Sequence, residues 1–135
     1  MRRDQQMTFL KAMDPNTGLI DGSKVRETGA ELHETYAAGD PFPHIVIDDF
    51  LPEPVLRMCL EEFDEARSDD QEVFDRAQER KKRQYRPDEM SERARNLFYT
   101  FNSRPFIKVI ENITGIKGLI PDPYFHVGGF HEIHT

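Results

Sequence analysis

The spacing of apolar residues changes along the second half of the chain, and this change constrains the fold more than any other feature. Over residues 91–115, apolar side chains recur every three or four positions, which is the period of an amphipathic helix. Over residues 124–135 the period falls to two, which is typical of a strand, or of two strand pieces joined at Gly128 and Gly129. Because helical and strand periods occupy separate segments, the sequence predicts an α+β fold.

Residues 91–115 are expected to form two helices. The first covers residues 91–101, and Ser103 is placed to cap the second, with Pro105 just inside its first turn. Gly115 is a natural C-terminal stop for that second helix.

A strand and another helix are expected earlier in the chain. Residues 43–50 are a β-branched run bounded by prolines, which predicts a strand. A helix then opens at residues 51–54 and continues to about Arg67. Its apolar face is expected to consist of Leu56, Cys59, Leu60 and Phe63. Cys59, the only cysteine, is expected to act as a buried small hydrophobe.

Residues 1–40 are weakly patterned. They contain turn sequences at residues 14–18 and 21–23, and a short helix is expected over residues 31–38. We therefore predict a weakly structured N-terminal arm over 1–40 and a folded domain over 41–135.

Charge and composition narrow the classes of partner. The net charge of -7 argues against a general nucleic-acid binder and against docking on anionic membranes. Residues 61–75 are strongly acidic and residues 76–86 strongly basic. For the basic run at residues 80–83, contact with a nucleic acid or another acidic partner is one alternative, and we expect instead a solvated face or loop beside the acidic neighbour. With one cysteine, no signal peptide and no transmembrane span in the sequence, we expect a cytoplasmic protein.

The tail carries histidines at spacings that do not match a metal site. His131-Glu132-Ile133-His134 has one residue between the glutamate and the second histidine, whereas the zinc motif HExxH needs two. On a strand, His131 and His134 would point to opposite faces. We therefore assign no metal ligand and no catalytic residue in this chain, while a zinc hydrolase built on this tail stays an alternative.

Three segments together resemble 2-oxoglutarate/Fe(II)-dependent dioxygenases of the prolyl-hydroxylase-like type. Residues 41–52 (PFPHIVIDDFLP) resemble the first strand and helix start of that family. Residues 120–125 (IPDPYF) and 128–135 (GGFHEIHT) resemble the segment that leads into its core barrel, and the helix at 101–116 fits the same order.

The resemblance implies the N-terminal portion of such an enzyme. The family fold is a double-stranded β-helix, a jelly roll with helices on its larger sheet, and it would be incomplete in this chain. The family holds Fe(II) with a His-x-Asp pair and a distal histidine, and this sequence contains no His-x-Asp pair. The complete enzyme would use Fe(II) and 2-oxoglutarate, with ascorbate as a further cofactor, to hydroxylate a peptidyl or small-molecule C–H bond. This chain alone is expected to bind none of them and to be inactive.

The same resemblance also predicts which residues line the cofactor pocket. Family members often place a tyrosine on the strand before the His-x-Asp pair, where it reaches the cosubstrate, and Ile133 occupies that position here. Alternation puts His131 and Thr135 on the same face as Ile133. His131 and Ile133 are therefore the predicted cofactor-pocket residues.

A second function class stays open. The charged segment 61–93 would serve as the contact face of a non-catalytic protein-interaction module. The sequence leaves the substrate and the oligomeric state open.

Overall fold

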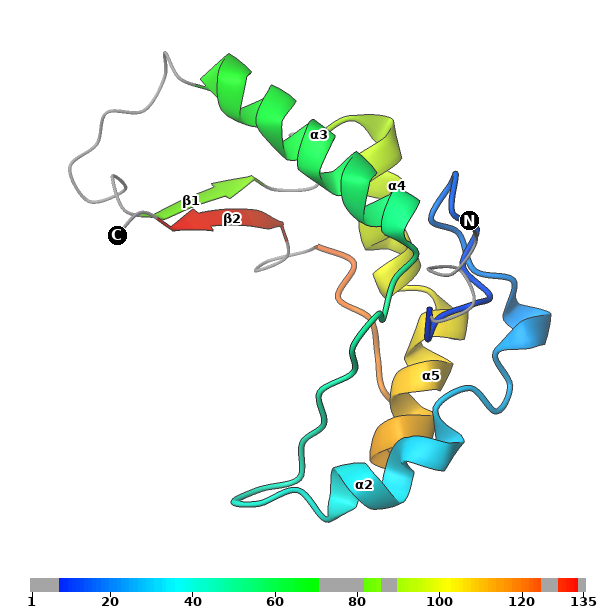
Figure 1. Cartoon of the computed structure of the whole chain (residues 1–135). Helices are drawn as coiled ribbons and strands as arrows, with labels where there is room; N and C mark the ends of the chain where they lie inside the picture. Colours follow the sequence, from blue (N-terminus) through cyan, green and yellow to red (C-terminus); the bar gives the residue numbers. More distant parts are fainter. Residues whose placement is uncertain (1–7, 71–81, 86–89, 125–128, 134–135) are drawn as a thin grey trace.

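Three helices and a small sheet form the frame of the molecule in the computed structural model, which describes residues 8–70, 82–85, 90–124 and 129–133. Helices α4 (Glu92–Phe101) and α5 (Arg104–Thr114) follow one another, and α3 (Glu53–Asp70) crosses α4 (Figure 1). Strands β1 (Lys82–Tyr85) and β2 (Phe130–Ile133) lie beside α3, while residues 8–40 run along α5. Among the described residues, no helix combines the length and the apolar character needed to cross a bilayer.

The two C-terminal helices are confirmed, together with their predicted ends. The Ser103 hydroxyl accepts a hydrogen bond from the backbone N–H of Phe106 at the start of α5, and Ser91 does the same for Ala94 in α4. Gly115 ends α5 in a left-handed conformation with φ 75°. These caps satisfy backbone groups that a helix end otherwise leaves unpaired.

Helix α3 is confirmed, but its predicted apolar face is partly wrong. Leu56 and Leu60 are 50% and 63% exposed, whereas Val55 and Met58 are buried. Cys59 and Phe63 are half-buried and pack against the core, as expected. The buried face starts one residue earlier than predicted, because Val55, Met58 and Cys59 already satisfy the helical spacing.

The N-terminal segment contains little regular structure, as expected. It comprises two 3-10 turns, η1 (Gly22–Lys24) and η2 (Ala30–Leu32), and the short helix α2 (His33–Ala37), which confirms the helix expected near residues 31–38. Residues 1–7 lie outside the described part.

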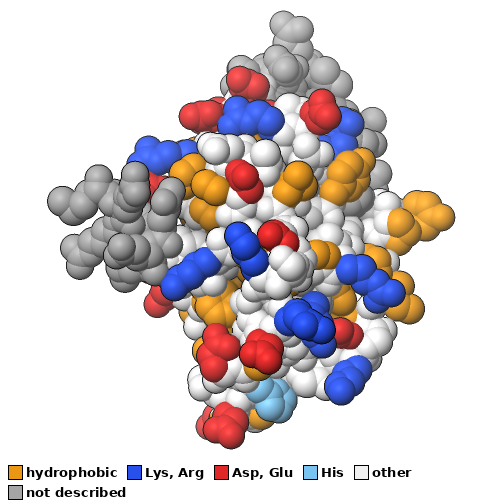
Figure 2. Space-filling view, turned by 90° about the vertical axis from the view of Figure 1, so that its right-hand side faces the viewer, with side chains coloured by type: hydrophobic (Ala, Val, Ile, Leu, Met, Phe, Trp, Pro, Cys, Tyr) orange, Lys and Arg blue, Asp and Glu red, His pale blue; other side chains and the backbone are white. Residues whose placement is uncertain are grey.

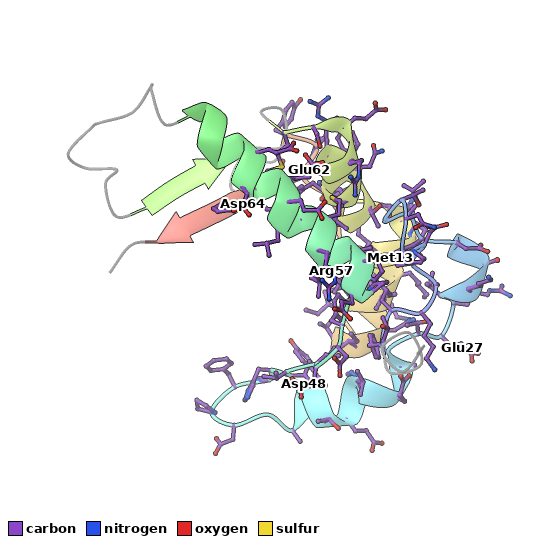
Figure 3. The ribbon with its side chains drawn as sticks, turned by 45° about the horizontal axis from the view of Figure 1, so that its top comes forward. Met13, Glu27, Asp48, Arg57, Glu62 and Asp64 are labelled. Carbon is purple, nitrogen blue, oxygen red and sulfur yellow. The ribbon has the colours of Figure 1, made fainter. Side chains whose placement is uncertain are left out.

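From residue 8 onward, however, the expectation of a loosely held arm is wrong. Leu10, Met13 and Val25 are at most 2% exposed and belong to the main core cluster. Met13 lies beside α3 in Figure 3. Burial of these apolar side chains stabilises the packing of the N-terminal segment on the core, although the segment contains little regular secondary structure.

Residues 44–47 belong to no helix or turn, but they are not a strand of any sheet in the described part of the chain, and residues 48–49 form a turn. Ile45 and Ile47 pack against the core, while Val46 between them is 82% exposed. Asp49 has φ 53°, which turns the chain toward α3. The strand predicted over residues 43–50 is therefore wrong for the described structure, although Ile45 and Ile47 face the core and Val46 faces solvent.

The sheet forms elsewhere, between β1 and β2. These strands pair antiparallel, with Lys82 opposite Ile133 and Tyr85 opposite Phe130. Residues 82–85, which belong to the charged stretch expected to form a solvated face or loop, are a strand, and this strand rather than residues 43–50 pairs with the last strand. The strand expected over 124–135 is confirmed for Phe130–Ile133, whereas residues 125–128 and 134–135 lie outside the described part.

Phenylalanine rings connect these elements in one chain of contacts. Phe9 stacks on Phe50 at 5.7 Å, Phe50 meets Phe106 edge-on at 6.2 Å, and Phe106 contacts Phe101 at 5.0 Å. The chain continues from Phe101 to Phe98 at 6.1 Å. Aromatic pairs at these spacings are attractive beyond the apolar area that they bury. The rings thereby join the N-terminal segment, α5 and α4 into one core.

Candidate functional site

Strand β2 carries both predicted pocket residues, and its position is fixed by Phe130. The Phe130 ring lies 5.4 Å from the Phe98 ring of α4 and 6.1 Å from the Phe63 ring of α3. Both contacts are edge-on, with interplanar angles of 64° and 75°. One face of the strand is thus packed on the helices.

His131 lies on the other face. Neighbouring side chains on a strand point to opposite sides of the sheet, so the residue after Phe130 faces away from α3 and α4. His131 is exposed, in agreement with this alternation, and its Cα lies opposite that of Gln84 in β1. Ile133 is paired with Lys82 at the end of the same strand, and its side chain lies outside the described part. The structure therefore gives β2 a packed face and an open face, with His131 on the open one.

The histidines of the described chain do not converge. His33 forms a hydrogen bond through Nδ1 with the carbonyl oxygen of Ile113 at 2.9 Å, and His44 forms one with that of Phe42 at 2.8 Å. His126 and His134 lie outside the described residues. Of the three histidines near the end of the chain, the structure therefore describes only His131.

No three metal-binding side chains gather among the residues that the structure describes. The ligand set that Fe(II) prefers in this type of oxygenase, two histidines and a carboxylate on one open face, is therefore not supplied by them. The described residues do not fit the iron site, and we derive no chemical step through it.

Cys59 has the character of a structural thiol. Burial raises its pKa above the ordinary value, and the nearby Glu62 carboxylate raises it further. Because the thiolate is the nucleophilic form, a raised pKa disfavours nucleophilic chemistry at neutral pH. This agrees with the prediction that Cys59 packs as a small hydrophobe.

A groove of about 880 Å³ lies away from β2, between the N-terminal segment and the extended segment before α3. Its walls come from residues 8–12, from residues 24–32 and from residues 45–48. It carries Lys11 and Lys24 as well as Glu31 and Asp48, so its charges are balanced. Sequence reasoning missed this groove because residues 1–40 were expected to be loosely held. The β-branched run within residues 43–50, which forms one wall of the groove, was the available signal.

The charged segment 61–93 is only partly described. Glu61, Asp64 and Glu65 are exposed on α3, and Arg83 lies opposite Glu132 in the sheet register. Residues 71–81 and 86–89 lie outside the described part, so most of the basic run cannot be placed. On the face drawn in Figure 2, acidic and basic side chains are interspersed, with no large field of one sign among the described residues.

Comparison of the chain with protein-family models, with curated proteins and with solved structures found no match.

Proposed function

We propose that this chain is the N-terminal portion of an Fe(II)- and 2-oxoglutarate-dependent dioxygenase of the prolyl-hydroxylase-like type, which hydroxylates a peptidyl or small-molecule C–H bond. The observation that carries the proposal is the resemblance of residues 41–52, 101–116, 120–125 and 128–135 to that family, in the family's own order. The cofactors of the complete enzyme would be Fe(II) and 2-oxoglutarate, with ascorbate as a further one.

The two faces of β2 support this proposal. A jelly roll with helices on its larger sheet needs strands that pack on helices with one face and line the barrel with the other. Phe130 contacts α3 and α4, and His131 takes the opposite, exposed side. In the proposed enzyme, His131 and Ile133 would line the cosubstrate pocket. An isoleucine at position 133 would leave the cosubstrate without the hydrogen bond that a tyrosine gives.

Location and substrate belong to the same proposal. A single cysteine is what a reducing compartment allows, so we propose a cytoplasmic enzyme. The described residues favour neither a peptide nor a small molecule as the substrate.

The test uses a longer chain that continues past Thr135. We expect this chain to convert 2-oxoglutarate to succinate only when Fe(II) is added, and the 135-residue chain, assayed in parallel, to remain inactive. A continuation that contains no His-x-Asp pair, or no Fe(II)-dependent turnover by the longer chain, would overturn the proposal.

The same preparations separate the alternatives. An interaction module built on segment 61–93 would capture a partner in a salt-sensitive manner while the longer chain binds no iron. A zinc hydrolase would hold stoichiometric zinc in the 135-residue chain and would lose it in His131→Ala.

A further inference from the structure

The extended segment 44–48 alternates like a strand at the edge of a sheet. Ile45 and Ile47 pack against the core cluster, whereas His44, Val46 and Asp48 are exposed. Val46 is 82% exposed, an unusual position for a β-branched apolar side chain. Asp48, labelled in Figure 3, marks the end of this segment nearer to α3.

The backbone of this segment has an edge that is unpaired among the residues that the structure describes. His44 donates its N–H to the carbonyl oxygen of Tyr36 at 3.1 Å, and the Asp49 carbonyl oxygen accepts from Phe9 at 2.7 Å. Between them, the N–H and C=O groups of Ile45, Val46 and Ile47 form no hydrogen bond with any residue that the structure describes.

Alternation also determines which backbone groups face outward. Successive residues of a strand direct their backbone groups to opposite edges. Because His44 faces Tyr36, the groups of Ile45 and Ile47 lie on the opposite edge. Such an edge is a template for another strand.

The sequence of this edge is complementary to itself. In an antiparallel pairing centred on Val46, Ile45 of one copy lies opposite Ile47 of the other, and the two pairs exchange four hydrogen bonds. Val46 then faces Val46 as a close pair without hydrogen bonds, and His44 faces Asp48 twice. A histidine, which becomes cationic on protonation, and a carboxylate form a favourable cross-strand pair.

We propose that segment 44–48 pairs with the same segment of a second copy of this chain across a two-fold axis at Val46. Such a contact is isologous, so it closes as a dimer and does not propagate. Its length is limited at both ends, because Pro43 has no N–H group to donate and the left-handed φ of 53° at Asp49 turns the backbone out of line. The proposal is independent of the proposed oxygenase activity.

The test combines sedimentation velocity with amide hydrogen exchange on the 135-residue chain over a range of concentrations. We expect a monomer–dimer equilibrium, with protection of the Ile45 and Ile47 amides that rises with the dimer fraction. Val46→Lys would place two ammonium groups against each other and weaken association at least about tenfold. Val46→Thr, which stays β-branched, is the matched control and should retain most of the association. Because position 46 is exposed, circular dichroism should show both variants folded.

Exchanging the charges at positions 44 and 48 provides an independent test of the same pairing. Asp48→Lys places a lysine opposite His44 and should weaken the dimer, and adding His44→Glu to that variant should restore it.

Three results would overturn the proposal. The first is a monomer at every concentration. The second is a dimer that Val46→Lys leaves unchanged, which would place the contact on another surface. The third is protection of the Ile45 and Ile47 amides that does not vary with concentration, which would show that a strand of the same chain occupies the edge.

Discussion

At the scale of single residues, two glycines with similar backbone angles lie in very different surroundings. Gly29 has φ 93°, and a Cβ atom added there would lie 2.6 Å from Cγ1 of Ile113 and 3.2 Å from the carbonyl oxygen of Val109. Gly118 has φ 77°, and a Cβ atom there would meet no atom within 4 Å. Gly29 therefore lets residues 28–30 approach α5 closely. At Gly118, glycine is favoured only because the backbone is left-handed there.

Gly29→Ala should be strongly destabilising for this reason. It adds a steric clash to the cost of the left-handed conformation, together about 2–5 kcal/mol. Gly118→Ala is the matched control and should cost only the conformational part, about 1–2 kcal/mol. Urea unfolding of both variants measures the difference, and equal losses would contradict the close contact between Gly29 and α5.

Cys59 provides a prediction on pH. Because burial raises its pKa, the folded thiol should react with a disulfide reagent along a pH profile whose midpoint lies above that of the unfolded chain. The raised pKa also means that the folded state holds this proton more tightly than the unfolded state. Its contribution to stability is therefore complete below the ordinary thiol pKa and is lost as pH rises through the folded value. Cys59→Ala should remove that part of the alkaline loss, and equal reactivity of folded and unfolded chains would refute the burial.

At the scale of elements, short polar contacts hold the N-terminal segment on α5. The Asn112 side chain donates to the carbonyl oxygens of Arg26 and Thr28 at 3.1 and 3.0 Å, and His33 bonds the carbonyl oxygen of Ile113. Asn112 of α5 thus satisfies two backbone carbonyl groups of the N-terminal segment, and His33 of that segment satisfies one of α5.

Asn112→Ala should therefore loosen this segment. Losing both hydrogen bonds should cost about 1–2 kcal/mol and raise hydrogen exchange over residues 24–32. Asn96→Ala on α4 is a suitable control, because the Asn96 side chain forms no hydrogen bond within the described structure, and its effect should stay within about 0.5 kcal/mol. Unchanged exchange in Asn112→Ala would show that the two bonds do not hold the segment.

The two faces of β2 lead to opposite expectations for adjacent residues. Phe130→Ala removes ring contacts with Phe63 and Phe98 and should cost about 2–3 kcal/mol. His131→Ala removes an exposed side chain and should change the free energy of unfolding by less than about 0.5 kcal/mol. Thermal unfolding of the pair compares them directly, and a larger loss in His131→Ala would reverse the assignment of the faces.

These elements also show how far the sequence could be interpreted. Helices α4 and α5 were predicted with their ends, because Ser103 and Gly115 act through local backbone geometry. Strand β1 was missed, because three of its four residues are charged or polar and they pair with β2 from nearly fifty positions away. Burial of Leu10 and Val25 was missed for the same reason, since it depends on a surface that distant segments build. Local signals were sufficient for helices and insufficient for the contacts that assemble them.

At the scale of the whole molecule, α3 and α4 contact one side of β2 through Phe130, and the opposite side carries the exposed His131. The face of the strand on which His131 lies was predicted from alternation. The contacts of Phe130 with Phe63 and Phe98, which define the packed face, could not be predicted from the sequence. In the proposed oxygenase, the metal would bind on the open side. The metal is therefore expected on the His131 side of the sheet, away from α3 and α4.

The most direct measurement of that claim is paramagnetic broadening by Mn²⁺ in the longer chain that continues past Thr135, with 2-oxoglutarate present. The broadening falls steeply with distance from the ion, so it distinguishes the two faces of one strand. We predict that the imidazole signals of His131 broaden strongly while the ring signals of Phe130 change little. Equal broadening of the two residues, or none in either, would contradict the account.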